Sequence, residues 1–220
     1  MKFFFLIPAR SNSKRIKDKN LFRLKNRKLI NFTLDSLKKI KKKNFVFFVS
    51  TDSKKIITEV KNNYKFINTH LRPKHLAKDN SKIEDLIKYL KNKNFFKDID
   101  YLILLSPCSP LRTSDDIMIF IKKIIQKKPD VCISVKELEK PIDWSLKLDK
   151  KHNLIKIFNK KVNIKNVFVP NGAFYAFNMK KKLNFDNFYS NKVIHHLMDR
   201  FKSLDVDVMD DLKQLKLILK

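Results

Sequence analysis

The chain has 220 residues and a mass of 26.3 kDa, with 43% hydrophobic and 11% aromatic residues. This apolar content can fill the core of one domain, so the composition excludes a disordered chain although 33% of the residues are charged. No apolar run is long enough to span a bilayer, no secretory signal is recognisable, and two cysteines make no disulfide framework. We therefore expect a cytoplasmic protein with reduced thiols and no membrane insertion.

The charge balance is strongly basic, with 50 Lys and Arg residues against 22 Asp and Glu residues and a net charge of +28. Such a balance raises nucleic-acid binding as a hypothesis. Most of the basic residues are lysines scattered among Asn, Ile and Phe, whereas arginine is preferred for bidentate recognition of bases and phosphates. The pattern is typical of a compositional bias toward A/T-rich codons, so we expect no specific nucleic-acid partner.

The first half of the chain alternates strand and helix patterns. Short apolar runs followed by polar loops predict strands at residues 3–7, 45–49, 66–67 and 101–105. Apolar residues three and four positions apart predict helices at residues 29–41, at 53–60 after Asp52 or Ser53, and at 81–90 with Ser81 as the N-cap.

The second half begins with a helix predicted at 114–125, capped by Ser114, and a strand at 131–135. The signal then weakens, and only strand-like pieces at 144–148 and 154–158 are visible before the strands predicted at 173–177 and 204–206 and a closing helix at 210–219. The alternation predicts parallel β-α-β units in a three-layer α/β domain over residues 1–220. Residues from about 136 to 200 should form a less regular, antiparallel or protruding subregion.

A basic loop, residues 7–20 with the sequence IPARSNSKRIKDKN, follows the first predicted strand. Ligands of open α/β sheets bind beyond the carboxyl ends of the strands. Backbone amides, serine hydroxyls and several cations suit a triphosphate, although the loop has neither the glycines nor the spacing of a P-loop. Without further context, such a loop is also typical of ordinary solvated surface.

Asp205 and Asp207 alternate along the strand predicted at 204–206, so their carboxylates should share one face. Two hard oxygen ligands on one face suit Mg²⁺, although an isolated pair is also typical of a turn at a strand end. Gly172, the one glycine of the chain, indicates a position that requires a positive φ or no side chain. Asn171-Gly172 is equally typical of a hairpin turn.

Other residues are weaker candidates. We expect His195 and His196 to have structural or interface roles, because adjacent side chains on a helix diverge. Trp144 should lie in the core or at an interface, and no partner base is indicated for Cys108.

Six motifs, in order along almost the whole chain, resemble those of the cytidylyltransferases that activate nonulosonic acids, the family of CMP-sialic acid synthetase. The loop at 7–20 is similar to the family's opening, IPAR-x-x-SK-x-x-x-x-KN. It is followed by VSTD at 49–52, an RP-x-x-LA-x-D-x-S element at 72–81, LLSPCSPLRT at 104–113, PNGA at 170–173 and SLDVDVMDDL at 203–212.

The resemblance implies a Rossmann-like nucleotide-diphospho-sugar transferase fold with a mixed, mainly parallel sheet, and a homodimer formed through the less regular segment. It implies that CTP and a 2-keto sugar acid react with Mg²⁺ to give a CMP-sugar and pyrophosphate, in an envelope-polysaccharide pathway. The implied catalytic residues are Arg10 and Lys19, and the implied nucleotide-binding residues are Ala9, Arg10, Ser13, Lys14, Lys19, Asn20, Arg72 and Ser81. Asp205 and Asp207 are the implied metal ligands.

On the sugar side, the resemblance implies contacts from Ser106, Lys161, Asn171 and Gly172. Here the chain departs from the family. Ser106 replaces the glutamine of the sialic acid enzymes, and Lys160 and Lys161 stand where an arginine is frequent, which keeps the charge but loses the bidentate fork. The sequence therefore does not identify the sugar, and a 3-deoxy eight-carbon sugar acid is an alternative substrate. A non-catalytic basic module that binds nucleic acid is the alternative from another class.

Overall fold

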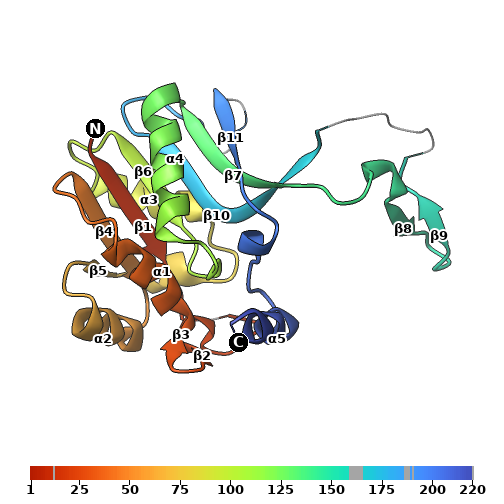
Figure 1. The fold of residues 1–220 in the computed structure, drawn as a ribbon, viewed down its shortest axis with the longest axis horizontal. Helices are drawn as coiled ribbons and strands as arrows, with labels where there is room; N and C mark the ends of the chain where they lie inside the picture. The colour runs from red at the N-terminus through yellow and green to blue at the C-terminus, as the bar shows by residue number, and fades with distance from the viewer. Residues whose placement is uncertain (12, 159–165, 186–188, 190, 220) are drawn as a thin grey trace.

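The core of the fold is a mixed seven-stranded sheet in the order β11-β7-β10-β6-β1-β4-β5, in a computed structural model that describes residues 1–11, 13–158, 166–185, 189 and 191–219 (Figure 1). Its strands are β1 (Phe3–Pro8), β4 (Phe45–Thr51), β5 (Asn68–Leu71), β6 (Tyr101–Leu105), β7 (Val131–Glu137), β10 (Phe168–Asn178) and β11 (Val193–Leu197). β10 runs antiparallel to β6 and β7, and the other neighbouring pairs are parallel. The predicted mixed, mainly parallel sheet is confirmed.

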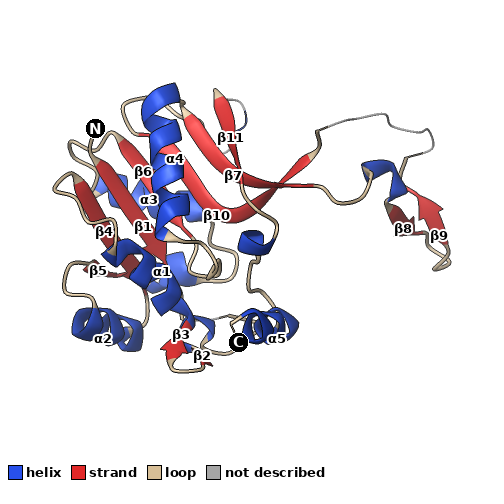
Figure 2. Ribbon diagram, in the orientation of Figure 1, coloured by secondary structure: helices blue, strands red, loops and turns tan. Residues whose placement is uncertain are grey.

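Helices cover both faces of this sheet (Figure 2). α1 (Leu29–Lys38), α2 (Lys54–Asn63) and α4 (Ser114–Lys127) lie on one face and α3 (Ile83–Asn92) on the other, whereas α5 (Met209–Ile218) packs outside the sheet, against α1 and the loop after β1. Because side chains alternate along a strand, Phe3 and Phe5 of β1 pack with α1, α2 and α4, whereas Phe4 and Leu6 pack with α3 on the opposite face. The three-layer α/β architecture is therefore confirmed.

A third apolar cluster brings the C-terminal segment to the loop after β1. It joins Ile16 of that loop and Leu24 of a small ribbon, β2 (Arg23–Leu24) with β3 (Arg27–Lys28), to Val206 and to Leu212 and Leu215 of α5. These side chains are nearly inaccessible to solvent, so the cluster is a small hydrophobic core of its own. Residues near position 206 are thereby held beside the basic loop.

The less regular subregion contains a protruding arm, which includes the 3-10 helix η3 (Ile142–Trp144), β8 (Leu146–Leu148) and β9 (Leu154–Lys156). β8 and β9 pair antiparallel, and Figure 1 shows them standing away from the sheet beyond the ends of β7 and β10. The arm leaves Trp144 66% and Leu154 68% exposed. β8 and β9 fall within the strand-like pieces predicted at 144–148 and 154–158, whereas β10 and β11, in the same part of the chain, belong to the central sheet. Trp144 does not lie in the core of this chain.

Several element boundaries differ from the predictions. The strand expected at 66–67 is β5 at 68–71, because the parallel pairing with β4 begins at Asn68. α1 ends at Lys38 rather than at residue 41, although Ile40 stays buried in the following turn. The N-cap of α4 is Thr113 rather than Ser114, and its hydroxyl accepts a hydrogen bond from Asp116 N at 3.2 Å. Ser53 caps α2 as expected.

Two predictions near the C-terminus are wrong. Residues 204–206 form an extended loop rather than a strand, and the backbone hydrogen bond found there runs from Val206 N to Cys108 O at 2.8 Å. His195 and His196 lie on β11 rather than on a helix. His196 is buried against the rings of Phe120 and Phe174, which agrees with a structural role. Among the described residues, no helix is both long and apolar enough to cross a membrane.

Candidate active site

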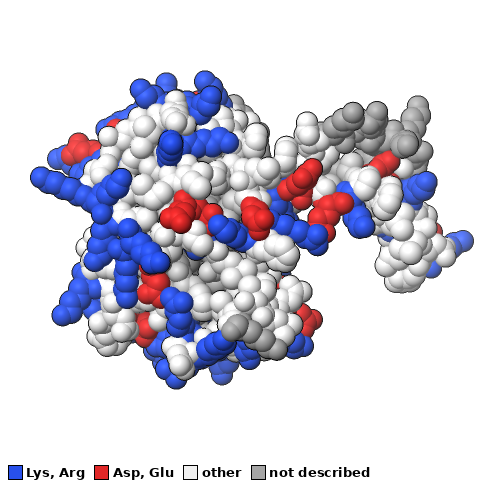
Figure 3. All heavy atoms as spheres, viewed as in Figure 1, with Lys and Arg blue, Asp and Glu red and all other residues white. Residues whose placement is uncertain are grey.

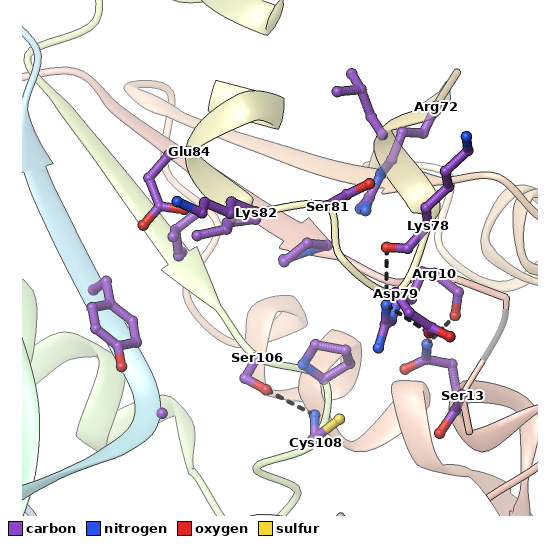
Figure 4. Close-up of a pocket in the computed structure, with 18 of the residues that line it drawn as sticks. Arg10, Ser13, Arg72, Lys78, Asp79, Ser81, Lys82, Glu84, Ser106 and Cys108 are labelled. Atoms are coloured by element: carbon purple, nitrogen blue, oxygen red, sulfur yellow. Dashed lines mark hydrogen bonds and ion pairs between the residues drawn. The ribbon is translucent and has the colours of Figure 1, made fainter. Parts of the chain in front are cut away.

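A cavity of about 630 Å³ opens at the carboxyl ends of β1 and β6, where a parallel sheet binds its ligands (Figure 4). Six parts of the chain line it: the loop after β1, the segment between β5 and the first turns of α3, the end of β6 with the loop after it, β10, the segment after β10, and the loop before α5. Of the residues singled out from the sequence, it brings together Arg10, Ser13, Lys14, Lys19, Asn20, Arg72, Ser81, Ser106, Gly172 and Asp207.

The loop after β1 is anchored at both ends. Ala9 is buried, and its backbone N–H donates to Ser50 O at 2.9 Å. The buried Asn20 donates from Nδ2 to Arg10 O at 2.9 Å. Between them, Arg10 Nη1 donates to Lys78 O at 3.2 Å (Figure 4). Ala9 therefore acts on the shape of the loop, Asn20 both fixes the loop and borders the cavity, and Arg10 reaches into the cavity.

The cations of this loop are held by carboxylates. Arg10 Nη1 lies 3.3 Å from Asp79 Oδ1, and Lys14 Nζ lies 3.3 Å from Asp79 Oδ2. The exposed fractions of the Arg10 and Lys14 side chains, 40% and 76%, leave both free to turn toward an anion in the cavity. The two bonds to Asp79 are exposed ion pairs of modest worth. A phosphate group can therefore displace that carboxylate at little cost.

Lys19 is the most enclosed cation of the loop after β1, with 13% of its side chain exposed. Its Nζ donates to Val206 O at 2.8 Å and to Asp207 Oδ1 at 3.1 Å. Burial opposes its charge, but the adjacent Cys108 thiol and the Asp207 carboxylate outweigh burial and hold the pKa of Lys19 above its usual value. A fixed positive charge therefore lies at the junction of the basic loop and the C-terminal segment.

Asp205 and Asp207 lie on the loop before α5, not on one face of a strand. Asp207 accepts from Arg15 Nη2 at 3.0 Å as well as from Lys19. Desolvation by the neighbouring chain and repulsion by Asp207 raise the pKa of Asp205 to about 6, although its side chain keeps access to solvent. The described residues contain no group of three or more His, Cys, Asp or Glu side chains that could hold a metal. The pair can thus offer a cation two carboxylates but not a closed cage.

Gly172 faces Asp205 from an irregular part of β10, where the register with β7 shifts between Pro170 and Tyr175. Its φ of +75° is one that side-chain-bearing residues rarely adopt, and a Cβ there would lie 3.5 Å from Asp205 Oδ2. The expected need for a positive φ is confirmed, and the alternative of a hairpin turn is wrong, because the strand continues through this point.

Asn171 does not line the cavity. It is buried, and its Nδ2 donates to Ser203 Oγ at 2.8 Å while its Oδ1 accepts from Ser134 Oγ at 2.5 Å. These bonds connect β10 with β7 and with the segment before the acidic loop. Lys161, the other residue expected on the sugar side, lies outside the described residues.

Arg72 and Ser81 lie on the side of the cavity formed by the segment between β5 and α3. Arg72 is only 7% exposed, and burial lowers the pKa of its guanidinium to about 10, which leaves it protonated at pH 7. Ser81 donates to His75 O at 2.8 Å and is not the N-cap of α3, which is Lys82. Ser81 thus fixes the turn before α3 and still borders the cavity.

The loop after β6 contributes Ser106 and Cys108. Ser106 Oγ accepts from Cys108 N at 3.2 Å (Figure 4), and burial raises the pKa of the Cys108 thiol. Beneath this loop lies a buried arginine that sequence reasoning missed. Arg112 donates to Ala173 O at 2.6 Å, to Thr33 Oγ1 at 2.9 Å and to Ser106 O at 3.0 Å. Arg112 therefore connects the loop to β10.

The far end of the cavity is apolar, which sequence reasoning also missed. Its walls come from β6, α3, β10 and the segment after β10, through Leu104, Ile83, Ile87, Tyr175, Phe177 and Phe185. The cavity is thus uneven in polarity. Arg10, Lys14, Lys19, Asp79 and Asp207 lie near the loop after β1, whereas the part beyond Ser106 is mainly aliphatic and aromatic and is bordered by Lys82 and Glu84 at the start of α3 (Figure 4). Such a cavity suits a ligand with anionic groups at one end and apolar substituents at the other.

Comparison with known proteins agrees with this geometry. The chain matches the Cytidylyltransferase family over residues 4–217. It is similar to the N-acylneuraminate cytidylyltransferase of Streptococcus agalactiae serotype III, with 29% identity over 222 residues that cover 96% of this chain and 52% of that protein. It is also similar to the CMP-N,N'-diacetyllegionaminic acid synthase of Legionella pneumophila, with 30% identity over 225 residues and coverage of 96% and 93%. The chain thus spans about half the length of the streptococcal relative.

Among solved structures, CMP:2-keto-3-deoxy-manno-octonic acid synthetase complexed with CTP matches 100% of this chain and 98% of its own, with a TM-score of 0.70 and 12% identity. At that identity the likeness shows the fold alone. It confirms the Rossmann-like nucleotidyltransferase fold that the six motifs imply.

Proposed function

Because the chain belongs to the cytidylyltransferase family, we propose that it transfers CMP from CTP to a nonulosonic, sialic-type sugar acid and releases pyrophosphate. The observation that carries this proposal is the cavity itself, in which a cationic loop and Asp207 lie beside a mainly apolar wall. The names of the bacterial relatives, an N-acylneuraminate cytidylyltransferase and a diacetyllegionaminic acid CMP synthase, support this class of acceptor.

In the proposed reaction, the anomeric hydroxyl of the sugar acid attacks the α-phosphorus of CTP. The P–O bond to the β-phosphate breaks, and pyrophosphate leaves. Catalysis of such a displacement depends on in-line positioning and on cations that stabilise the charge that develops on the phosphates. Arg10, Lys14 and Lys19 supply those cations, and they exchange the carboxylates of Asp79 and Asp207 for phosphate oxygens when CTP binds.

We propose Mg²⁺ as the cofactor, held by Asp205 and Asp207. The donor set fits, because Mg²⁺ takes few protein carboxylates and completes its coordination with water and phosphate oxygens. Desolvation and, after it, repulsion by Asp207 raise the pKa of Asp205 to about 6, and a cation between the two carboxylates would offset both. When bound, the metal would neutralise charge on the phosphates and orient them.

The base and the sugar use opposite sides of the cavity in this proposal. Arg72 and Ser81 take the cytosine end, as the family resemblance implies. Ser106 and Gly172 border the sugar end, next to the apolar wall, which suits acyl or deoxy substituents. An alternative 3-deoxy eight-carbon sugar acid shares the deoxy carbon but carries no acyl group, so the wall favours an acylated nonulosonic acid.

The basic charge does not require a nucleic-acid partner. Lys and Arg lie over the whole face of the molecule in Figure 3, over the body and the arm alike, with Asp and Glu among them. A dispersed charge attracts any polyanion without selecting a sequence. The cavity, by contrast, is a specific feature, so the enzymatic interpretation is favoured over a non-catalytic binding module.

We further propose a homodimer formed through the arm, in the cytoplasm. The arm exposes Trp144, Leu146, Leu148 and Leu154 together, an apolar surface that a second chain would cover. A reducing compartment agrees with the unpaired thiols of Cys108 and Cys132. Sedimentation of the wild type and of Trp144→Ser tests the dimer: the wild type should sediment as a dimer and the variant as a monomer, and a monomeric wild type would refute it.

The activity is tested by incubating the protein with Mg²⁺, CTP and each of a panel of sugar acids, and by measuring pyrophosphate. We expect release with nonulosonic acids and little with the 3-deoxy eight-carbon acid. Release with the eight-carbon acid alone would replace the proposed acceptor, and no release with any acid would refute the proposed function.

A further inference from the structure

A chain of three polar side chains runs from the buried side of β5 to the cavity. Ser50 on β4 and His70 on β5 are register partners of the parallel pair, so their side chains lie next to each other on one face. Ser50 Oγ lies 3.1 Å from His70 Nδ1, and Arg72 Nε lies 3.2 Å from Ser50 Oγ. The completely buried Ser50 thus connects the imidazole to the guanidinium that lines the cavity.

The surroundings hold the imidazole in one place. Its ring stacks on Phe48, with 5.8 Å between ring centroids, and Tyr89 and Phe95 flank it with centroids 5.9 and 5.6 Å away. Burial and the neighbouring charge of Arg72 lower the pKa of His70, so the ring is neutral at neutral pH. A neutral, packed ring has one nitrogen that can accept a hydrogen bond.

The donors along this chain can be assigned. Arg72 Nε always carries a hydrogen, so Ser50 Oγ must accept there, and the single hydroxyl hydrogen is left to donate to His70 Nδ1. The ring hydrogen then lies on Nε2. Arg72 is fixed a second time by Nη2, which donates to Ser50 O at 2.7 Å, and a third time by its backbone N–H, which donates to Thr51 O at 2.7 Å.

These hydrogen bonds leave the Nη1 side of the Arg72 guanidinium available to bind a ligand. Nε and one hydrogen of Nη2 are engaged by Ser50, and no acceptor for Nη1 is found among the described residues. A long arginine side chain in a roomy cavity could otherwise adopt many rotamers, and fixing them in advance reduces the entropy lost on binding. The bonds to Ser50 restrict Arg72 to one orientation before any ligand arrives.

We propose that His70 and Ser50 are positioning residues for nucleotide binding, which act by holding Arg72 in the orientation that recognises the base of CTP. The inference rests on the proposed function, because it takes Arg72 as a contact of the nucleotide. Neither His70 nor Ser50 lines the cavity, so neither contacts the reacting atoms. Their effect should appear in nucleotide affinity and leave the chemical step intact.

Three variants separate this role from simple packing. Ser50→Ala removes the buried hydroxyl that connects His70 to Arg72, and the side chain loses only this one oxygen atom. His70→Phe keeps the aromatic stack but has no acceptor, whereas His70→Asn places an amide oxygen close to the position of Nδ1 and restores the acceptor. Phe95→Leu is the matched control, because it disturbs the ring packing around His70 and leaves the three polar groups unchanged.

The measurements are the Kd for CTP by calorimetry, with Mg²⁺ and without sugar, and kcat and KM under steady-state conditions. Loss of one hydrogen bond to a charged group is typically worth about tenfold in affinity. We expect Ser50→Ala and His70→Phe to raise Kd and KM for CTP about tenfold, with kcat at saturating CTP within about twofold. His70→Asn and Phe95→Leu should bind CTP as the wild type does.

The inference would be overturned by wild-type affinity in both Ser50→Ala and His70→Phe, or by equal weakening in His70→Asn and His70→Phe. Loss of affinity in Phe95→Leu equal to that in His70→Phe would also overturn it, because packing alone would then explain the effect. The proposed function itself would be contradicted by a different result, namely that the wild-type protein binds CTP no more tightly than ATP, UTP or GTP. Melting temperatures of all variants show whether each is folded.

Discussion

The Nζ of Lys19 lies 3.1 Å from Oδ1 of Asp207, so a proposed phosphate ligand and a proposed metal ligand are bound to each other. Each group satisfies the other while the cavity holds no triphosphate. In the proposed reaction, the lysine would bind phosphate oxygens of CTP and the aspartate would hold Mg²⁺. The ion pair thus keeps in place two charged groups that are each proposed to bind an opposite charge.

Lys19→Ala should lower kcat by about 10²–10³, a typical loss when one preorganised charge contact to the transition state is removed. The KM for the sugar acid should change much less, because the lysine lies at the phosphate end of the cavity. Steady-state kinetics at saturating CTP measure both. Lys17→Ala, a lysine of the same loop outside the cavity lining, is the control and should behave as wild type. An undiminished kcat in Lys19→Ala would make Lys19 an ordinary structural lysine.

Asp205→Asn and Asp207→Asn should each abolish Mg²⁺-dependent activity and leave the melting temperature nearly unchanged. Neither carboxylate is in the core, so the fold does not depend on it. Initial rates measured against Mg²⁺ concentration check the first part, and thermal unfolding checks the second. Asp210→Asn, an exposed position on α5 that pairs with Lys213, is the matched control. Wild-type activity in EDTA together with unfolded variants would show that the pair is structural.

Ser106→Gln should shift sugar preference toward N-acetylneuraminic acid. Serine is shorter than glutamine and has no amide to bind a polar substituent, so the wild type should prefer a bulkier or differently substituted nonulosonic acid. Sites built around a hydrogen bond discriminate by about 10⁴-fold against analogues that lack the group, and sites without it discriminate weakly. The ratio of kcat/KM for N-acetylneuraminic acid and a diamino relative is the measurement. A ratio unchanged by the substitution would disprove this assignment of Ser106.

Asp116→Asn should destabilise the fold by about 1 kcal/mol at pH 7, since it breaks a charge-assisted bond from Lys202 Nζ, 2.8 Å away, and weakens the cap of α4. Burial opposes ionisation of Asp116, but Lys202 and Thr113 outweigh it and lower its pKa. A lowered pKa stabilises the fold above the usual aspartate value and loses that contribution as the pH falls through the folded value.

The difference in melting temperature between wild type and Asp116→Asn should therefore be largest near neutral pH and should shrink below about pH 4. Asp115→Asn is the control, because Asp115 lies in the same helical turn and leaves the bonds of Thr113 and Lys202 intact. A difference that grows in acid would contradict the assignment.

The sheet and most helices were predictable because their signals are local. The run Phe3–Ile7 is apolar at every position, and a strand covered by helices on both faces requires that pattern. Most polar residues of the cavity were indicated by the motifs, although Ala9, Asn171 and Asp205 are not in its lining. The errors concern elements that depend on distant partners. β11 exists because it pairs with β7, whereas residues 204–206 join no strand of the described sheet, and the long-range backbone bond found there runs from Val206 N to Cys108 O.

The same reason explains the missed residues. The burial of Arg112 could not be predicted from the sequence. Its guanidinium is buried because three distant oxygen atoms, of Thr33, Ser106 and Ala173, accept its hydrogen bonds. The apolar end of the cavity is likewise assembled from β6, α3, β10 and the segment after it, and no single stretch of sequence shows it. Tertiary partners, not propensities, decide such features.

The central claim, transfer of CMP to a sugar acid, is tested most directly by phosphorus NMR of the product. Wild-type protein is mixed with CTP, Mg²⁺ and the sugar acid that gives the fastest pyrophosphate release. We predict one phosphodiester resonance, from CMP joined to the anomeric oxygen, and an equal amount of pyrophosphate. CDP together with a sugar phosphomonoester, or CMP without the phosphodiester from the first time point, would contradict the account.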